Sequence, residues 1–120
     1  MAARSDPGTA SLVKVTAALL PGTVTGRLAA VGKVLSDPRR IEILHLLALA
    51  SEPVCVIDLE HHLGVAQSTV SYHLKILVDS GVCDRRPRGR WTYYSVRAEV
   101  LAEFRHRLER LIHFPGSLHR

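Results

Sequence analysis

Residues 67–81 carry an outward-facing set of polar side chains that differs from an ordinary helix surface. The apolar residues Val70, Leu74 and Leu77 fall on one stripe at helical spacing, which indicates an amphipathic helix. The opposite face holds amide, hydroxyl, phenol and ammonium groups: Gln67, Ser68, Ser71, Tyr72 and Lys75. Such groups donate or accept hydrogen bonds at base edges, whereas a solvated face is usually richer in Glu and Lys. The pattern favours a recognition helix for nucleic acid.

A dense group of basic residues follows at the next expected turn: Arg85, Arg86, Arg88 and Arg90. They surround Pro87 and Gly89, and the flanking residues 82–86 and 91–96 are rich in Val, Thr, Tyr and Trp. Turn residues between two such segments predict a β-hairpin. These guanidinium groups, together with Lys75, are suited to phosphates, which supply affinity and register but little sequence information. The candidates for reading base edges are then Gln67, Ser68, Ser71 and Tyr72.

The elements before this helix predict a helix-turn-helix. Asp37 and Pro38 are typical of a helix start, because the carboxylate accepts orphan amide hydrogens and proline tolerates the first helical position. This helix should extend to about residue 50, and its apolar residues surround most of its circumference, which indicates burial: Ile41, Ile43, Leu44, Leu46, Leu47 and Leu49. A short helix over residues 56–63 then ends at Gly64. A short helix, a glycine turn and an amphipathic helix have the spacing of a helix-turn-helix, and the hairpin completes a winged helix.

Composition favours a single folded domain, and the motifs that the sequence lacks favour a protein that is not an enzyme. The chain has 120 residues, 47% of them hydrophobic, and a formal net charge of +5, which favours polyanionic partners. No apolar run is long enough to span a bilayer and no signal peptide is evident, so we expect a cytoplasmic protein with reduced thiols at Cys55 and Cys83. A P-loop, a dinucleotide-binding glycine pattern and an H-E-x-x-H motif are all missing from the sequence, so we expect no enzyme.

The predicted organisation has three regions. Residues 1–22 are expected to be a flexible arm with a short helix over residues 11–20. Residues 23–113 are expected to form the winged helix-turn-helix domain, which is mainly α-helical with a small β-hairpin. Further helices are predicted over residues 25–36 and 98–113, and residues 114–120 form a tail.

Three segments resemble the ArsR/SmtB family of metal-responsive winged-helix regulators in their order and spacing. They are LSDPRRIEILHLL at residues 35–47, VCVIDLEHHLGVAQSTVSYHLKIL at residues 54–77 and GRWTYYSV at residues 89–96. The resemblance implies a homodimer that binds imperfect palindromes in promoter DNA and represses until a metal ion lowers its DNA affinity. Residues 25–36 and 98–113 are then the expected dimer elements, because their apolar stripes need a partner and two-fold symmetry places two recognition helices one DNA turn apart.

The resemblance suggests a first place for an effector, at the start of the first motif helix. Thiolate-sensing members carry Cys-Val-Cys-Asp-Leu there, whereas this chain has Cys55 but Ile57 in place of the second cysteine. Residues 1–44 contain neither Cys nor His, and one thiolate cannot assemble a soft three-sulfur site. The arsenite interpretation is weakened, but sensing of arsenite at Cys55, or of thiol redox state through Cys55 and Cys83, stays open as an alternative.

The second place for an effector is the last predicted helix. At helical spacing one face of this helix gathers polar residues: Glu99, Glu103, His106, Arg110 and His113. Imidazole with carboxylate suits Ni²⁺, Zn²⁺ or Co²⁺ better than arsenite, and His119 adds a further donor. Nearby arginines oppose a cation, yet we expect a divalent-metal site that uses His106, His113 and Glu103.

The remaining histidines have simpler interpretations. His61 and His62 end the first motif helix, where they interact favourably with its C-terminus, and they are weaker metal candidates. His45 is interpreted as a hydrogen-bonded core residue and His73 as packed beneath the DNA-facing surface. Two alternatives to a metal-controlled regulator also follow: an effector-free regulator that works with a partner protein, and a winged helix that docks on protein instead of DNA.

Overall fold

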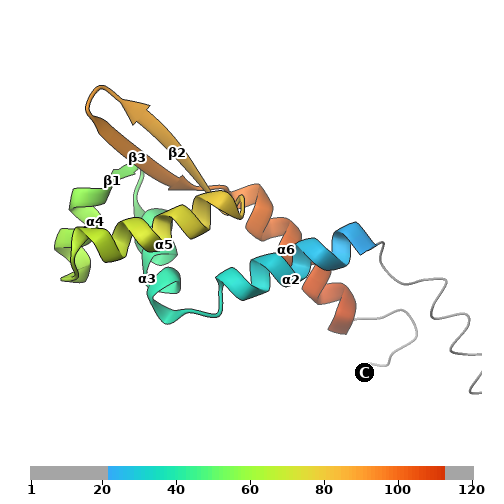
Figure 1. Cartoon of the computed structure of the whole chain (residues 1–120). Helices are drawn as coiled ribbons and strands as arrows, with labels where there is room; N and C mark the ends of the chain where they lie inside the picture. Colours follow the sequence, from blue (N-terminus) through green and yellow to red (C-terminus); the bar gives the residue numbers. More distant parts are fainter. Residues whose placement is uncertain (1–21, 113–120) are drawn as a thin grey trace, which may run out of the picture.

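The computed structural model describes residues 22–112, so the helix expected over residues 11–20 and the tail lie outside the described residues. The elements follow one another as α2 (Gly22–Val34), α3 (Pro38–Leu49), β1 (Val54–Cys55), α4 (Val56–Leu63), α5 (Gln67–Asp79), β2 (Cys83–Arg88), β3 (Trp91–Val96) and α6 (Ala98–Ile112). Figure 1 shows the hairpin of β2 and β3 projecting from one end of a helical body, with α2 and α6 at the other end. The predicted mainly α-helical winged helix-turn-helix is confirmed. No helix between residues 22 and 112 is long and apolar enough to cross a membrane.

Helix α3 begins as the sequence predicts. The carboxylate of Asp37 accepts a hydrogen bond from the backbone N–H of Arg39 at 2.8 Å, and Pro38 occupies the first helical position. The backbone N–H of Arg39 lowers the pKa of Asp37, and the nearby charge of Arg40 lowers it further. The N-cap is therefore held in its ionised form, which is the better hydrogen-bond acceptor.

Helix α3 packs on one side only, so the prediction of burial all round is wrong. Ile43, Leu44 and Leu47 are buried, whereas Ile41 is 45% and Leu49 is 70% exposed. His45 is also exposed, which corrects its interpretation as a core histidine. The physical reason is that α3 contacts α5 and β3 along its buried side, and no described element covers its outer side.

The core is formed where α3, α4 and α5 meet. The largest fully buried side chains come from these helices and from the turn after α5: Ile43, Leu59, Val70, Leu74, Leu77 and Val82. Three of them form the apolar stripe of α5, whose polar side must then face outward. The helix-turn-helix is therefore held together by the stripe that the sequence predicts.

Helix α5 ends in a hydrogen-bonded glycine cap. The N–H of Gly81 donates to the carbonyl of Val78, and the N–H of Val82 donates to the carbonyl of Leu77, both at 3.0 Å. Gly81 has a φ of 85°, which glycine adopts without the steric cost of a Cβ. These two hydrogen bonds satisfy carbonyl groups in the last turn of the helix, and the chain continues directly into β2.

The hairpin is longer than predicted and has an additional strand. Pro87, expected in the turn, lies in β2 opposite Thr92, and the turn contains only Gly89 and Arg90 between the paired residues Arg88 and Trp91. Proline is tolerated because β2 is an edge strand in the order β1-β3-β2. Gly89 has a φ of 61°, as expected at the first position of a tight hairpin turn. The short strand β1, which the sequence interpretation missed, pairs with β3 and ties α4 to the hairpin. We call the hairpin of β2 and β3 the wing.

Helices α2 and α6 lie side by side at the end of the molecule away from the wing tip (Figure 1). Val31 and Val34 of α2 join the core, and Val100 and Phe104 of α6 pack against it. The C-terminal half of α6 is different, because its apolar side chains remain exposed: Leu108, Leu111 and Ile112, at 40%, 65% and 69%. These two helices match the elements predicted over residues 25–36 and 98–113.

The burial pattern predicts very different effects for two leucine substitutions. Leu74→Ala should lower the free energy of unfolding by about 2–5 kcal/mol, because it removes a fully buried side chain and leaves a cavity. The matched control Leu49→Ala should change it by less than about 0.5 kcal/mol, because that side chain is exposed. Urea unfolding followed by circular dichroism measures both. Equal losses would contradict the one-sided packing of α3.

Candidate nucleic-acid interface

Helix α5 presents the side chains predicted to meet nucleic acid. Gln67, Ser68, Ser71, Tyr72 and Lys75 are all exposed, and Tyr72 retains 62% of its surface. Thr69, which the sequence interpretation missed, is also exposed and lies three residues before Tyr72, on the same side of the helix. The three-residue spacing between Thr69 and Tyr72 is visible in the sequence and could have identified Thr69. The exposed surface thus offers donors and acceptors without an apolar side chain among them.

The start of α5 leaves backbone amides without a side-chain cap. The N-cap residue Ala66 makes no side-chain hydrogen bond, and the first turn contains no acidic residue. The orphan N–H groups and the positive end of the helix dipole are therefore available to an anion. A phosphate of a nucleic-acid backbone fits such an end.

Lys75 is held along the helix by a weak ion pair. Its ammonium nitrogen lies 3.0 Å from a carboxylate oxygen of Asp79, and the two side chains are 77% and 62% exposed. Ion pairs between such exposed groups contribute less than about 1 kcal/mol. Lys75 can therefore exchange this partner for a phosphate at little cost.

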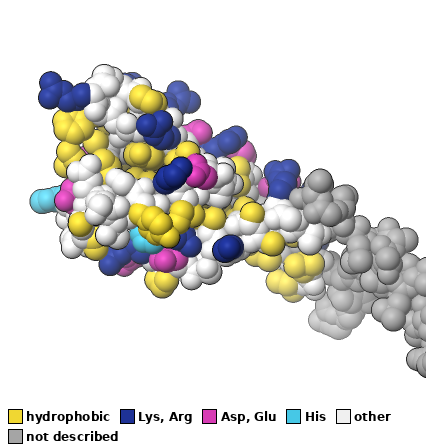
Figure 2. Space-filling view, in the orientation of Figure 1, with side chains coloured by type: hydrophobic (Ala, Val, Ile, Leu, Met, Phe, Trp, Pro, Cys, Tyr) yellow, Lys and Arg dark blue, Asp and Glu magenta, His cyan; other side chains and the backbone are white. Residues whose placement is uncertain are grey.

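The wing carries positive charge that no carboxylate neutralises. Among the described residues, the structure gives no ion pair to its four arginines, which are all exposed: Arg85, Arg86, Arg88 and Arg90. Elsewhere arginines are paired with glutamates: Arg27, Arg39, Arg97 and Arg107. Figure 2 shows dark blue basic side chains around the upper part of the molecule, where Figure 1 places the wing. Within the described region the wing therefore carries four arginines without an ion pair, whereas Lys33, Arg105 and Arg110 lie outside the wing.

The wing arginines point in different directions, which the sequence interpretation did not separate. Because side chains alternate along a strand, Arg85 shares a face with Tyr94 and the core residue Cys83. Arg86 and Arg88 share the opposite face with their partners, Tyr93 and Trp91. The guanidinium carbon of Arg88 lies 5.8 Å from the centre of the Tyr93 ring, a cation–π contact that orients it. Arg90 is the one wing arginine that lies in the turn, beside Gly89.

The predicted metal ligands are only partly described. Glu103 does not present a free carboxylate, because its oxygens lie 2.8 Å from Arg27 and 3.7 Å from Arg107. His106 is exposed on α6, and His61 and His62 are exposed in the last turn of α4. Within residues 22–112 no group of three or more His, Cys, Asp or Glu residues is placed to hold a metal ion. His113 and His119 lie outside the described residues, so their role as ligands stays a prediction.

The two cysteines are buried, free and far apart in the sheet. Cys55 lies opposite Tyr93 on one side of β3, and Cys83 lies opposite Val96 on the other side. Two strand spacings separate their Cα atoms by more than about 9 Å, beyond the roughly 7 Å that a disulfide can bridge. Burial, with a smaller contribution from the charge of Asp84, raises the pKa of the Cys83 thiol to about 12. An intrachain redox pair of Cys55 and Cys83 is therefore incompatible with this register.

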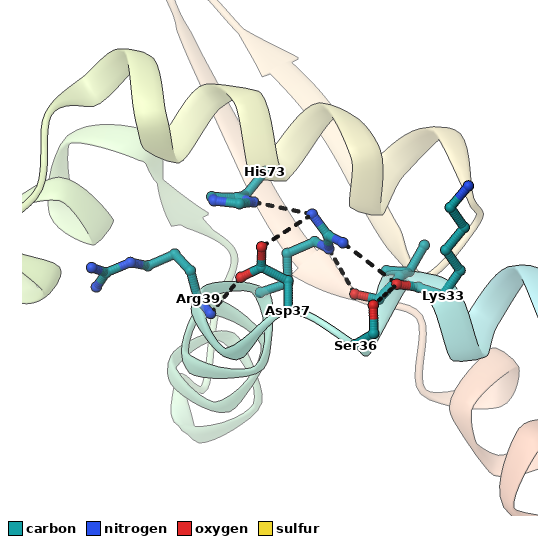
Figure 3. A network of polar contacts seen from close by, with 7 residues as sticks. Lys33, Ser36, Asp37, Arg39 and His73 are labelled. Carbon is teal, nitrogen blue, oxygen red and sulfur yellow. Dashed lines mark hydrogen bonds and ion pairs between the residues drawn. The ribbon is translucent and has the colours of Figure 1, made fainter.

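His73 is buried at 8% exposure, as the sequence interpretation expected. Its ring nitrogen Nδ1 lies 3.3 Å from a guanidinium nitrogen of Arg40, whose side chain is 11% exposed. Figure 3 shows this contact within a polar network that also includes Asp37 and the end of α2. The sequence interpretation assigned no role to Arg40, because spacing along the chain does not reveal a partner thirty-three residues away.

Comparison with known sequences identifies relatives for this arrangement. Residues 37–84 match the family model described as bacterial regulatory protein, arsR family. The chain is 40% identical over 74 residues to an arsenical resistance operon repressor of Staphylococcus xylosus, covering 62% of this chain and 69% of that protein. It is 40% identical over 67 residues to an arsenical resistance operon repressor of Bacillus subtilis, covering 56% of this chain. The chain thus spans only 63% of the length of the Bacillus subtilis repressor.

Comparison with solved structures gives a similar result. A homodimeric winged helix-turn-helix DNA-binding domain from Mycobacterium bovis, described as a possible ArsR-family transcriptional regulator, superposes with a TM-score of 0.59 at 27% identity. The alignment covers 100% of this chain and 99% of that domain. The similarity therefore includes the helix-turn-helix, the wing and the two flanking helices.

Proposed function

The chain belongs to the ArsR family of bacterial regulatory proteins, and on this premise we propose that it regulates transcription by binding duplex DNA as a homodimer. The observation that carries the proposal is the polar outer side of α5 beside a wing whose arginines have no carboxylate partner in the described structure. Membership of this family supports the prediction that the chain is a regulator and not an enzyme.

The two parts of the interface have different proposed roles. Helix α5 enters the major groove, where Gln67, Ser68, Ser71 and Tyr72 contact base edges. Lys75, the wing arginines and the uncapped start of α5 bind phosphates and fix the position of the protein on the duplex. All of these side chains are exposed, so they are accessible to a duplex.

A homodimer through α2 and α6 is supported by the apolar surface at the end of α6. Leu108, Leu111 and Ile112 are exposed there, and Figure 2 shows hydrophobic side chains at this lower right end of the described region. A two-fold pair buries such a patch against its own copy. The similar Mycobacterium bovis domain is described as homodimeric. We propose an imperfect palindrome as the DNA site, because a two-fold dimer presents two equivalent α5 helices.

For the effector we propose a divalent metal ion, Ni²⁺, Zn²⁺ or Co²⁺, bound at the end of α6 by His106 and His113. Exposure of the His106 side chain supports access to an ion. Imidazole ligands suit these ions. Because the described residues of one chain supply no set of three ligands, the proposed site draws on both protomers or on His119.

The proposed division of roles predicts two distinct DNA-binding defects. The probe is a duplex that the wild-type protein selects from a random library, compared with an unrelated duplex. Arg88→Ala with Arg90→Ala should weaken binding to both and reduce the salt slope by about one for each lost phosphate contact. Ser71→Ala with Tyr72→Ala should reduce discrimination between the two by about 1–3 kcal/mol. Fluorescence anisotropy over a salt series measures both.

Arg105→Ala provides a charge-matched control, because Arg105 is exposed on α6 away from α5 and the wing. It should leave discrimination and the salt slope unchanged. Wild-type protein that binds neither duplex in dilute buffer would overturn the proposed function and favour a module that docks on protein.

The dimer proposal predicts a monomer from a single charge on α6. Leu111→Glu should dissociate the dimer, because it places a carboxylate in the apolar patch that the partner is proposed to cover. Leu49→Glu on α3 is the matched control, since Leu49 is 70% and Leu111 is 65% exposed, and Leu49 lies outside α2 and α6. Sedimentation velocity gives both oligomeric states, and a dimeric Leu111→Glu variant would place the interface elsewhere.

The metal proposal predicts coupling between ion binding and DNA binding. Addition of the best-binding ion among Ni²⁺, Zn²⁺ and Co²⁺ should lower affinity for the selected duplex by at least about fivefold. His106→Ala should abolish this effect, whereas His45→Ala, which removes an exposed histidine on α3, should retain it. Calorimetry of the ion together with anisotropy of the duplex makes the test. Coupling that survives His106→Ala would exclude His106 of α6 as a ligand of the regulatory metal ion.

A further inference from the structure

One guanidinium group joins the three helices that matter most for the proposed function. Nε of Arg40 donates to the backbone carbonyl of Val34 at 2.6 Å, and another nitrogen reaches the carbonyl of Lys33 at 3.5 Å, both at the C-terminal end of α2. A third nitrogen lies 3.8 Å from the carboxylate of Asp37, the N-cap of α3, and 3.3 Å from Nδ1 of His73 in the middle of α5. Figure 3 shows these contacts between the end of α2, the start of α3 and His73 of α5.

The contact with His73 requires a neutral imidazole. A guanidinium is always protonated and has no acceptor, so Nδ1 of His73 must offer its lone pair and the ring hydrogen must lie on Nε2. A proton on Nδ1 would remove this hydrogen bond and place two cations against each other. The buried position of His73 reduces screening of that repulsion by water.

The other groups around His73 act on the same equilibrium. Asp37 of α3 attracts an imidazolium, because its carboxylate faces the same guanidinium, and Tyr72 contributes a ring contact at 5.1 Å between centroids. From α2 the ammonium of Lys33 is exposed, and only its backbone carbonyl enters the network. Protonation of His73 therefore exchanges an attractive contact with Arg40 for repulsion from Arg40 and attraction to Asp37. The exchange removes the directional contact between α5 and the end of α2.

We infer that Arg40 is a positioning residue for DNA recognition, which holds α5 at a fixed angle to α2 through a neutral His73. Protonation of His73 releases this hold and weakens binding to the specific duplex. The inference rests on the proposed function, because it needs α5 to be the recognition helix and α2 to belong to the dimer interface. In such a dimer a small rotation of α5 against α2 changes the separation of the two recognition helices.

The expected direction of the pH effect on DNA affinity distinguishes protonation of His73 from protonation of exposed histidines. Four other histidines are exposed: His45, His61, His62 and His106. A proton gained by any of them adds positive charge, which strengthens binding to both duplexes alike. Release of α5 by His73 acts in the opposite direction and only on the specific duplex. Loss of specific binding on acidification, without loss of non-specific binding, is therefore the signature.

The test measures the affinity of the full chain for the selected and the unrelated duplex at pH 7.5 and at pH 5.5. Wild-type protein should lose about tenfold or more in affinity for the selected duplex and none for the unrelated one. His73→Asn keeps an acceptor near the position of Nδ1 but cannot titrate, so it should bind as wild type at pH 7.5 and show no acid loss. His45→Asn is the matched control and should retain the wild-type profile.

Arg40→Met supplies a second test from the other side of the contact. It should bind the selected duplex about tenfold or more weakly already at pH 7.5, with no further acid loss, while thermal unfolding shows whether the fold persists. Should Arg40→Met not fold, the ¹⁵N shifts of the His73 ring in the wild-type protein decide, because the inference requires the Nε2–H tautomer at pH 7.5.

Three results would overturn the inference while leaving the proposed function intact. They are a ratio of specific to non-specific affinity that does not fall on acidification, a fall in that ratio that persists in His73→Asn, and an Nδ1–H tautomer at pH 7.5. Failure of the wild-type protein to bind either duplex at pH 7.5 would instead overturn both.

Discussion

Burial of one apolar stripe determines the direction of every side chain that α5 offers to DNA. Val70, Leu74 and Leu77 are fully buried against α3 and α4, so the opposite side of a helix that has only one apolar stripe must face outward. The glycine cap at Gly81 then leads directly into β2, which fixes where the wing begins relative to that outer side. The packing of the core and the position of the interface are therefore one constraint.

The wing extends this constraint by strand alternation. The register pairs Cys83 with Val96 and buries Cys83 in the core at the start of β2. Because side chains alternate along a strand, Arg85 then lies on the same face of the wing as Cys83, and Arg86 lies on the opposite face. A slip of one residue would exchange the two faces and expose Cys83. The strand β1, although only two residues long, braces the other edge of β3 and joins the wing to the start of α4. The base of the wing is thus paired on both edges of β3, at Tyr93 and Tyr94.

Local signals predicted most of this architecture, and long-range contacts account for the rest. Asp37 and Pro38, the stripe of α5, Gly64 and Gly81 each act within a few residues, and the structure confirms the helix boundaries that they predict. The exposed side of α3 was not predictable in this way, because six apolar residues around a helix do not tell which of them a neighbour will cover. His45, the strand position of Pro87, the pairing of Glu103 with Arg27 and the contact of Arg40 with His73 likewise depend on residues distant in the sequence.

Apolar packing alone does not fix the angle between α2 and α5. Val31 and Val34 share the core with Leu74 and Leu77, but hydrophobic contact is non-directional and tolerates small rotations of one helix on another. A planar guanidinium with donors in fixed directions is different, because it satisfies the α2 carbonyls and the His73 ring together only at one relative orientation. A dimer that reads two half-sites about 34–36 Å apart needs such an orientation to be the same in both protomers. The directional contact therefore lies where α2, the proposed dimer helix, meets α5, the proposed recognition helix, and that is where Arg40 lies.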